Sequence, residues 1–243
     1  MNTPDTGDNE GGPVKRRPKI VVLTGAGMSA PSGLSTFRDS NGLWHQHRIE
    51  DVATPEAWLR HPDVVLEFYN QRRTQACAAQ PNAGHCAIAE LERGYDVVVI
   101  TQNVDDLHER GGSRHVLHLH GELTKARSTC DSSLLYEIGS ASIRIGDRCA
   151  KGSQLRPHIV WFGEEVPKME EAIHCMEDAA KVLVVGTSLS VYPAAGLVEH
   201  APRAAEKVLV DLHADRTPPG FRVLKGSADK LLPGLVQEWL AQV

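Results

Sequence analysis

The sequence predicts an α/β fold: a Rossmann-like parallel sheet with helices on both faces, plus a small inserted module. Short apolar, β-branched runs recur at residues 19–24, 95–101, 181–185 and 207–211, and helix-compatible segments lie between them. Buried strands that alternate with helices are typical of a parallel sheet covered on both faces. Residues 124–155 instead carry mainly small polar and charged side chains, which indicates an inserted module outside the sheet.

The domain boundaries follow from these patterns. Residues 1–17 are rich in Gly, Pro, Asp and Asn and include a Lys15-Arg16-Arg17 cluster, so we expect a flexible tail. The stretch 55–80 has helical spacing, with Pro55 and Pro62 as helix starts, and so does 82–93. We expect one domain over residues 18–243, with a large part at about 18–41, 81–120 and 156–243, and a small module at about 42–80 and 121–155.

Composition excludes several classes of protein. The 243 residues are 41% apolar with a net charge of -5, so there is no overall basic field to hold nucleic acid. No apolar run approaches the roughly 20 residues of a membrane span. The first residues lack a signal-peptide core, and the five scattered cysteines do not resemble a disulfide framework. We expect a cytoplasmic location, no membrane partner and no specific nucleic-acid partner.

A glycine-rich loop follows the first predicted strand. Residues 25–30 (GAGMSA) match the G-x-G-x-x-G/A pattern, in which small residues let backbone N–H groups approach a pyrophosphate. Taken alone, this loop fits dinucleotide binding and an ordinary strand-to-helix turn about equally well. The acid that dehydrogenases place about 20 residues later should end a second strand. Glu50 and Asp51 stand near that distance but follow no strand-like run, so a standard dehydrogenase fits poorly.

Longer segments carry a more specific resemblance. The chain resembles the sirtuins, NAD-dependent protein deacylases, over about residues 18–240, and in particular a bacterial, desuccinylase-type branch of that family. The matching segments come in the family's order. They are 25–44 (GAGMSAPSGLSTFRDSNGLW), 101–105 (TQNVD), 119–121 (LHG), 156–164 (RPHIVWFGE) and 186–189 (GTSL).

The resemblance implies a reaction and a base. Sirtuins split the nicotinamide–ribose bond of NAD and release free lysine, nicotinamide and O-acyl-ADP-ribose. A histidine suits the required base because its pKa lies near neutrality, and the motif match makes that base His120, whereas His118 is assigned no role. The resemblance implies that Asn103 orients the ribose and a water molecule and that Asp105 binds the nicotinamide amide. The alternative is a turn in which these two side chains bond their own backbone.

The remaining NAD contacts are also implied by the resemblance. Phe37 would shield the reacting ribose carbon from water, and Arg38 would bind the phosphates. Asp211 stands where relatives often have Asn, but a carboxylate can still accept from ribose hydroxyls. The implied cofactor set is Gly25, Ala26, Gly27, Ser29, Phe37, Arg38, Gln102, Asn103, Asp105, Gly186, Thr187, Ser188, Asp211 and Ala228.

The acyl specificity is predicted from a helix. Tyr69 and Arg72 are three residues apart, so both can face one pocket and together hold a carboxylate. With the small Ala53 they match the sirtuin branch that removes succinyl and malonyl groups. Spacing alone favours an amphipathic helix with Tyr packed inward and Arg in solvent. The substrate peptide is expected to add as a strand beside residues 160–163. The implied substrate-binding set is Ala53, Tyr69, Arg72, Val160, Phe162 and Gly163.

The structural zinc site of most sirtuins is incomplete in this sequence. Such a site takes four ligands, usually from two C-x-x-C pairs. Here Cys130 is followed by Ser133 and Cys149 by Gly152, so each pair lacks one cysteine. We predict no tight structural zinc and no other metal, with the module held by packing and hydrogen bonds.

The sequence therefore predicts an enzyme that uses NAD to remove succinyl, malonyl and also acetyl groups from lysine in proteins or peptides. Two alternatives stay open. A protein mono-ADP-ribosyltransferase would use the same cleavage of NAD, and a non-catalytic module would bind NAD without needing a base.

Overall fold

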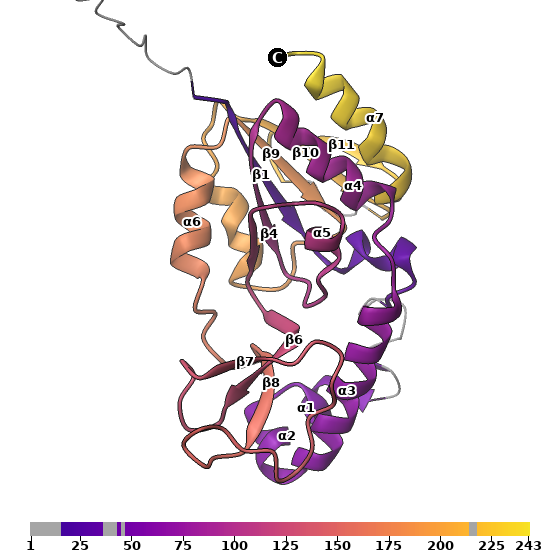
Figure 1. Cartoon of the computed structure of the whole chain (residues 1–243). Coiled ribbons are helices and arrows are strands. Elements are labelled where there is room, and N and C mark those ends of the chain that lie inside the picture. The colour runs from indigo at the N-terminus through magenta and orange to yellow at the C-terminus, as the bar shows by residue number, and fades with distance from the viewer. Residues whose placement is uncertain (1–15, 36–42, 45–46, 214–217) are drawn as a thin grey trace, which may run out of the picture.

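A computed structural model of the chain describes residues 16–35, 43–44, 47–213 and 218–243. It has a large α/β part and a smaller module, drawn at the top and bottom of Figure 1. Most of the predicted tail lies outside the described residues.

A six-stranded sheet forms the centre of the large part within the described residues, and every neighbouring pair of its strands is parallel. The four predicted strands are present, because each is a short, buried run rich in valine and other branched side chains. Two short edge strands, β5 and β11, were not predicted. In spatial order the strands are β11 (Arg222–Lys225), β10 (Glu206–Asp211), β9 (Lys181–Val185), β1 (Lys19–Thr24), β4 (Asp96–Thr101) and β5 (Val116–His118).

Helices cover both faces of this sheet, as the sequence predicted. One face packs against α4 (Ala83–Glu90), the 3-10 turn η3 (Leu91–Arg93) and α7 (Ala228–Leu240). The other packs against α6 (Met169–Glu177) and the 3-10 segment η4 (Ala194–His200). Figure 1 shows these two layers on opposite sides of the strands. The predicted fold class is confirmed.

The strand order reverses at β1. Strands β4 and β5 lie on one side of it, and β9, β10 and β11 lie on the other. Thr24 is in register with both Thr101 and Val185, so three neighbouring strands end side by side. In open α/β sheets, ligands bind outside the carboxyl ends of the strands at such a reversal. The topology therefore places a binding site directly after Thr24.

The smaller module packs helices on an antiparallel sheet. Its core contains Val65, Phe68 and Tyr69 from the helices and Leu123 and Ile159 from the strands. Its elements are α1 (Ile49–Val52), α2 (Pro55–Arg60), α3 (Pro62–Ala78), β6 (Gly121–Ser128), β7 (Leu135–Glu137), β8 (Leu155–Ile159) and the pair β2 (Leu43–Trp44) and β3 (His47–Arg48).

Two of the module's helices, α2 and α3, begin at the two prolines that the sequence singled out. Pro55 starts α2, and Thr54 caps it by accepting a hydrogen bond from Ala57 N at 3.1 Å. Pro62 starts α3, which continues for 17 residues and carries Tyr69 and Arg72. A proline at the first helical position needs no N–H partner and already has the required φ.

One boundary differs from the sequence prediction. Strand β8 pairs with β6, so Leu155–Ile159 lies in the small sheet, whereas residue 156 was predicted to reopen the large part. The strand β6 was not predicted either. Its side chains alternate between buried and half-buried positions and include charged residues, because only one face of this sheet is covered. Such strands lack the continuous apolar run that marked the central sheet.

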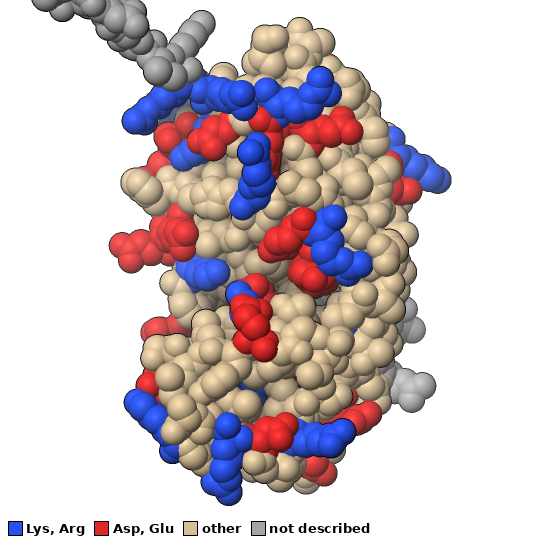
Figure 2. Space-filling model, viewed as in Figure 1, with Lys and Arg blue, Asp and Glu red and all other residues tan. Residues whose placement is uncertain are grey.

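The surface carries charges of both signs. Figure 2 shows Lys and Arg side chains interspersed with Asp and Glu on the face in view, with no large area of a single sign. Among the helices that the structure describes, every one is too short or too polar to cross a membrane.

Candidate active site

A cavity of about 620 Å³ lies beyond the carboxyl ends of β1, β4, β9 and β10. Its walls come from both parts of the molecule. The large part contributes the glycine loop, and the small module contributes side chains of α3 and the segment after β8. A cleft between two parts of a fold is a common place for a ligand.

Every predicted site residue within the described part of the chain lines this one cavity. Phe37 and Arg38 lie outside the described residues. The predicted residues in the wall are His120; Gly25, Ala26, Gly27, Ser29, Gln102, Asn103, Asp105, Gly186, Thr187, Ser188, Asp211 and Ala228; and Ala53, Tyr69, Arg72, Val160, Phe162 and Gly163.

The glycine loop packs directly against a second glycine turn. Gly25 N donates to Val185 O at 3.0 Å, and Gly27 N donates to Gly186 O at 2.8 Å. A Cβ on Gly27 would lie 2.7 Å from Gly186 Cα, and Gly186 has a φ of +61°. Both positions therefore need glycine for the contact between the two turns, in addition to any approach of a pyrophosphate.

The loop continues into short turns rather than a regular α-helix. Two 3-10 turns, η1 (Ala26–Met28) and η2 (Ala30–Ser32), follow it, and Gly33 ends the second turn with a left-handed φ of +88°. The Asn82 side-chain amide donates to Met28 O at 2.9 Å, which ties the loop to the start of α4. The glycine loop is thus followed by hydrogen-bonded 3-10 turns and not by the N-terminus of an α-helix.

Asn103 links the end of β4 to the glycine loop. Its side-chain amide nitrogen donates to Gly25 O and lies equally close to Ser29 Oγ, each at 3.1 Å. Its backbone N–H donates to Thr101 Oγ1 at 3.0 Å. Only 6% of Asn103 is exposed, so these bonds hold the residue in one position. The segment after β4 is fixed against the predicted pyrophosphate loop.

Asp105 is buried at the same end of the cavity. Burial, the largest influence, raises the pKa of its carboxyl, against the opposing hydrogen bonds from Leu107 N and Ser29. Its Oδ1 accepts from Leu107 N at 3.2 Å. The local-turn alternative that the sequence left open is therefore realised at one oxygen. The residue also lines the cavity, and its predicted contact with the nicotinamide amide stays a prediction.

His120 carries its proton on a defined nitrogen. Its Nδ1 lies 3.1 Å from the main-chain oxygen of Gln102, which can only accept, so Nδ1 is the donor. Burial lowers the pKa of His120, and the Gln102 carbonyl opposes this only in part. The ring is consequently neutral near pH 7, and Nε2 keeps the lone pair that a base requires.

Tyr69 and Arg72 face the cavity from α3. Burial raises the pKa of Tyr69 to about 12, so the phenol keeps its proton. Burial also lowers the pKa of Arg72 to about 10, which leaves the guanidinium charged at neutral pH. The solvated arginine of the alternative interpretation does not occur here, because Arg72 Nε is buried. The neighbouring Arg73 points elsewhere and donates to Leu123 O at 2.5 Å.

Two residues in the cavity wall were missed at the sequence level. Trp161 lies beside Tyr69 with ring centroids 6.5 Å apart, and the guanidinium of Arg156 stacks 3.3 Å from its ring centroid. Glu164 binds Arg156 at 2.7 Å and accepts from Trp161 N at 2.8 Å. Trp161 and Glu164 both lie in the RPHIVWFGE segment, from which the sequence analysis selected only Val160, Phe162 and Gly163.

Cys130 and Cys149 come together in the small module. The hydroxyl of Ser128 lies 3.3 Å from Cys130 Sγ and donates to Cys149 Sγ at 3.2 Å. In the part of the chain that the structure describes, no group of three or more His, Cys, Asp or Glu side chains could hold a metal ion. Two thiols do not fit a tetrahedral zinc site, and the absence of zinc stays a prediction.

A family model described as "Sir2 family" matches residues 25–193, which is more than half of the chain. The chain belongs to the Sir2 family. This Sir2 assignment confirms the sirtuin resemblance.

Close relatives within the Sir2 family are bacterial. A protein of Bacteroides thetaiotaomicron named NAD-dependent protein deacylase is 53% identical over 197 residues, which cover 79% of this chain and 84% of the relative. A Helicobacter pylori protein of the same name is 48% identical over 224 residues, covering 90% and 97%.

Solved Sir2 structures are similar over nearly the whole chain. A Sir2 homologue in complex with NAD has a TM-score of 0.82 at 40% identity and covers 93% of this chain and 91% of that chain. A Sir2 mutant in complex with 2'-O-acetyl ADP-ribose has the same TM-score and identity and covers 93% of both chains.

Proposed function

We propose that the protein is an NAD-dependent deacylase that removes succinyl and malonyl groups, and also acetyl groups, from lysine side chains. One observation supports this most strongly. His120, the Asn103–Asp105 segment, the two glycine turns and the Tyr69–Arg72 pair all line one cavity. Relatives that are about half identical over most of the chain carry the name NAD-dependent protein deacylase.

The described residues fit NAD. Gly27 and Gly186 are in backbone contact, and both glycines line the cavity. The backbone N–H groups of such glycine turns can approach a pyrophosphate closely. Asp211 ends β10 at the cavity wall and is the proposed partner of the adenosine ribose hydroxyls. Bound NAD would supply the ribose carbon to which the acyl oxygen forms a bond. Nicotinamide is the leaving group on that carbon. Phe37 and Arg38 are proposed to complete this site.

His120 provides the base in this proposal. Its Nδ1–H donates a hydrogen bond to the Gln102 carbonyl, so Nε2 is the nitrogen that takes a proton from a ribose hydroxyl. The lowered pKa keeps the ring in the neutral form that can accept this proton at pH 7. Asn103 and Asp105, fixed by Thr101, Ser29 and Leu107, orient the ribose and the nicotinamide amide.

The acyl pocket is proposed to recognise a carboxylate. A neutral Tyr69 hydroxyl can donate one hydrogen bond, and the Arg72 guanidinium can donate two to the same group. Burial in the cavity wall disfavours the charged form of Arg72, and charge-assisted hydrogen bonds to a bound carboxylate would offset that cost. Ala53 is buried and small, and its carbonyl accepts from Phe162 N at 3.0 Å. A longer acyl chain therefore has room beside it.

The peptide that carries the lysine is proposed to lie along residues 160–163. Phe162 and Gly163 line the cavity, Phe162 is 44% exposed, and Gly163 has a positive φ. A peptide that adds beside Val160 and Gly163 would bind mainly through backbone hydrogen bonds, with weak dependence on sequence. A cytoplasmic location and substrates among cytoplasmic proteins belong to the same proposal.

The test compares succinyl, malonyl and acetyl copies of one lysine peptide with wild type and Arg72→Met. We expect the variant to lose about 100-fold in kcat/KM for the succinyl and malonyl peptides, because truncating one partner of a desolvated charge pair costs about 2–5 kcal/mol. The acetyl peptide should change by only a few fold.

Arg60→Met is the matched control, because Arg60 is exposed on α2 and does not line the cavity. It should leave the succinyl-to-acetyl ratio of kcat/KM as in wild type. An Arg72→Met variant with the wild-type ratio would show that the acyl pocket is wrongly assigned.

A further inference from the structure

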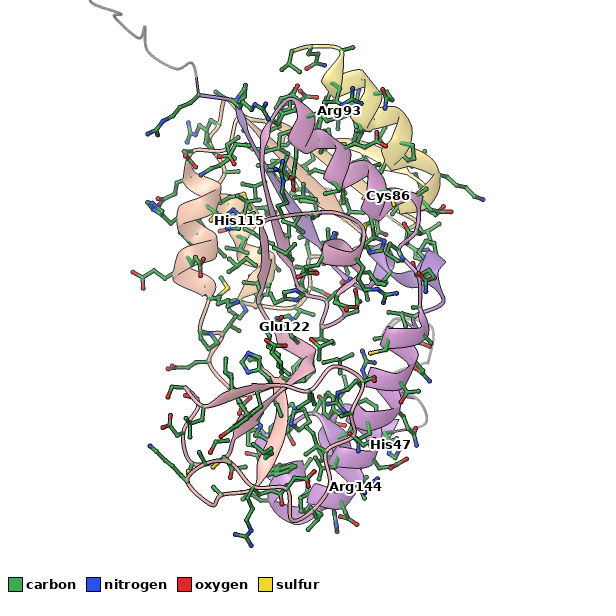
Figure 3. All side chains as sticks on the ribbon, in the orientation of Figure 1. His47, Cys86, Arg93, His115, Glu122 and Arg144 are labelled. Carbon is green, nitrogen blue, oxygen red and sulfur yellow. The ribbon has the colours of Figure 1, made fainter. Side chains whose placement is uncertain are left out.

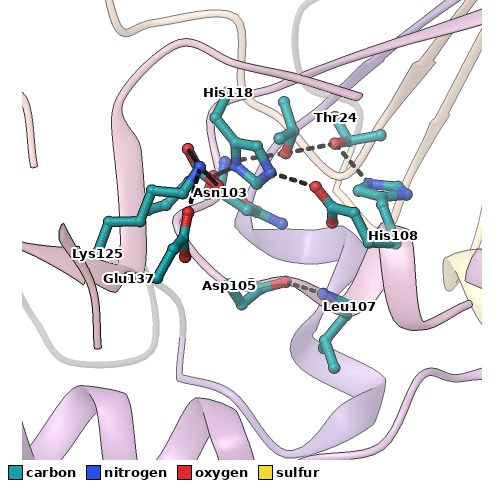
Figure 4. Close-up of polar contacts among 11 residues, drawn as sticks. Thr24, Asn103, Asp105, Leu107, His108, His118, Lys125 and Glu137 are labelled. Atoms are coloured by element: carbon teal, nitrogen blue, oxygen red, sulfur yellow. Dashed lines mark hydrogen bonds and ion pairs between the residues drawn. The ribbon is translucent and has the colours of Figure 1, made fainter. Parts of the chain in front are cut away.

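His118 is a buried histidine that the reaction scheme does not use. It ends β5, two residues before His120, and only 4% of it is exposed. Its Nδ1 lies 3.1 Å from the main-chain oxygen of Asn103, and its Nε2 lies 2.7 Å from Glu109 Oε1. Figure 4 shows its ring beside Asn103, with dashed lines from both nitrogens.

The two partners of His118 determine its protonation. A main-chain oxygen can only accept a hydrogen bond, and so can an ionised carboxylate. A neutral imidazole has one N–H and could satisfy only one of them. Both bonds form together when both ring nitrogens carry protons, which makes His118 a cation between the Asn103 carbonyl and Glu109.

The surroundings favour this charge. Burial alone would lower the pKa of His118, but the hydrogen bond and charge of Glu109, the charge of Glu122 and the Asn103 carbonyl outweigh it and raise the pKa. Burial raises the pKa of Glu109, but the bond to His118 and nearby positive charges bring it below its ordinary value. The charged pair is therefore the stable form at neutral pH.

Three other titratable groups interact electrostatically with the His118 ring: Glu122, Asp105 and His108. Glu122 on β6, at the junction of the two parts in Figure 3, is paired with Lys125 at 3.0 Å. Asp105 feels the His118 charge, which opposes the rise in its own pKa. Burial, with His85 and His118, holds the pKa of His108 well below its ordinary value, so His108 adds no second cation.

His118 and His120 form hydrogen bonds with the carbonyl oxygens of two consecutive residues. His120 binds the oxygen of Gln102, and His118 binds the oxygen of Asn103. On the other side, Thr101 Oγ1 accepts from Asn103 N and from Thr24 Oγ1, which lies 3.0 Å from His108 Nε2. The segment that carries Asn103 and Asp105 is thus held through its backbone from two directions.

We propose that His118, as a doubly protonated ring tied to Glu109, is a positioning residue that holds the Asn103 carbonyl and so orients Asn103 and Asp105 toward NAD. This inference rests on the proposed function for the roles of Asn103 and Asp105. His118 does not line the cavity, and it acts through the backbone of Asn103. Loss of its proton removes one of the two hydrogen bonds and loosens the segment.

The sign of the pH dependence follows from the raised pKa. His118 contributes its positioning bond in full below the ordinary histidine pKa, and the contribution is lost as pH rises through the raised value. Glu109→Gln keeps the shape of the side chain and an accepting oxygen but removes its charge. In this variant the pKa of His118 falls, so the loss of NAD turnover on raising the pH begins at a lower pH than in wild type.

The first measurement needs no turnover. Nitrogen-15 NMR of labelled histidine in the whole protein reports whether each ring nitrogen carries a proton, between about pH 6 and pH 9. We expect two N–H groups on His118 at neutral pH, a signal that disappears in His118→Gln. The exposed His115, labelled in Figure 3, provides the signal of a solvent-exposed histidine for comparison in the same spectra. One N–H on His118 at neutral pH overturns the proposal.

The second measurement compares steady-state kinetics of Glu109→Gln and of the control His115→Gln. We expect Glu109→Gln to lower kcat/KM for NAD about tenfold at alkaline pH, within the roughly 100-fold that misplaced positioning groups cost. The KM for the acyl peptide and the melting temperature should stay close to wild type. A pH profile identical to wild type overturns the proposal.

The two proposals fail separately. If wild type gives no acyl-lysine-dependent turnover of NAD, the proposed function fails, and His118 is then judged by NMR and by NAD affinity measured calorimetrically without peptide. Weaker NAD binding by Glu109→Gln than by His115→Gln supports the positioning role, and equal binding contradicts it. Glu109 is partly exposed, so this variant should fold even where His118→Gln does not.

Discussion

The imidazole of His120 donates its Nδ1 proton to the main-chain oxygen of Gln102 across 3.1 Å. This bond fixes the orientation of the ring and leaves Nε2 as the basic nitrogen at the cavity. The carbonyl comes from the segment that also carries Asn103, so the base and its neighbours are held as one unit. The expected effects of mutation and pH follow from that arrangement.

The variant His120→Ala should lose about 100- to 10,000-fold in kcat, the usual range for removing a general base. NAD affinity should change little, because the proposed phosphate contacts come from the backbone of the two glycine turns and not from His120. Nicotinamide release in the presence of acyl peptide measures kcat, and calorimetry measures NAD binding. His174→Ala, at an exposed position on α6, is the control. Full turnover by His120→Ala would remove His120 from the role of base.

The acid limb of the pH–rate profile should lie below the ordinary histidine value of about 6.5. Burial lowers the pKa of His120, so the ring stays neutral and active until the pH falls through that lowered value. Protonation then removes the lone pair on Nε2. The profile of kcat/KM against pH, with peptide and NAD both varied, checks this. A loss of activity that begins well above pH 6.5 would contradict the assigned protonation state.

The variant Gly27→Ala should destabilise the protein by about 1–3 kcal/mol, as other overpacked substitutions do. The new Cβ would lie 2.7 Å from Gly186 Cα, and both are backbone positions that cannot move aside. Thermal unfolding without ligand measures the change. Gly234→Ala on α7 is the matched control, because its Cβ would meet nothing within 4 Å and should leave stability unchanged or slightly higher.

Metal analysis of the purified protein should find no stoichiometric zinc. Ser133 and Gly152 stand where a second pair of thiolates would be needed, and Cys130 and Cys149 bond the hydroxyl of Ser128 instead. Treatment with a chelator should leave the melting temperature unchanged. One zinc ion per chain would mean that ligands beyond these two cysteines complete the site.

The central sheet was predictable because its strands are continuous buried runs. Helices cover both faces of β1 and β9, so nearly all of their side chains are apolar. Their valine-rich sequences were therefore enough to predict strands. β6 was hidden because its buried positions alternate with partly buried ones and it includes charged residues. The pairing of β6 with β8 depends on contacts between residues far apart in the sequence, which local patterns do not reveal.

The site was predictable where a motif names its residues. The LHG segment indicated His120, but nothing local indicated His118, because its partners Asn103 and Glu109 lie 15 and 9 residues away. Trp161 was missed for a related reason. Its place in the cavity depends on the stack with Arg156, which only the folded β8 segment brings about.

The most direct test of the proposed function is the product mixture from wild type, NAD and a succinyl-lysine peptide, analysed by mass spectrometry. We expect free-lysine peptide, nicotinamide and O-succinyl-ADP-ribose in equal amounts, with none formed by His120→Ala. ADP-ribose attached to protein would instead indicate a mono-ADP-ribosyltransferase. The absence of nicotinamide with every acyl peptide would indicate a protein that binds NAD without catalysis, and either result would contradict the proposed deacylase.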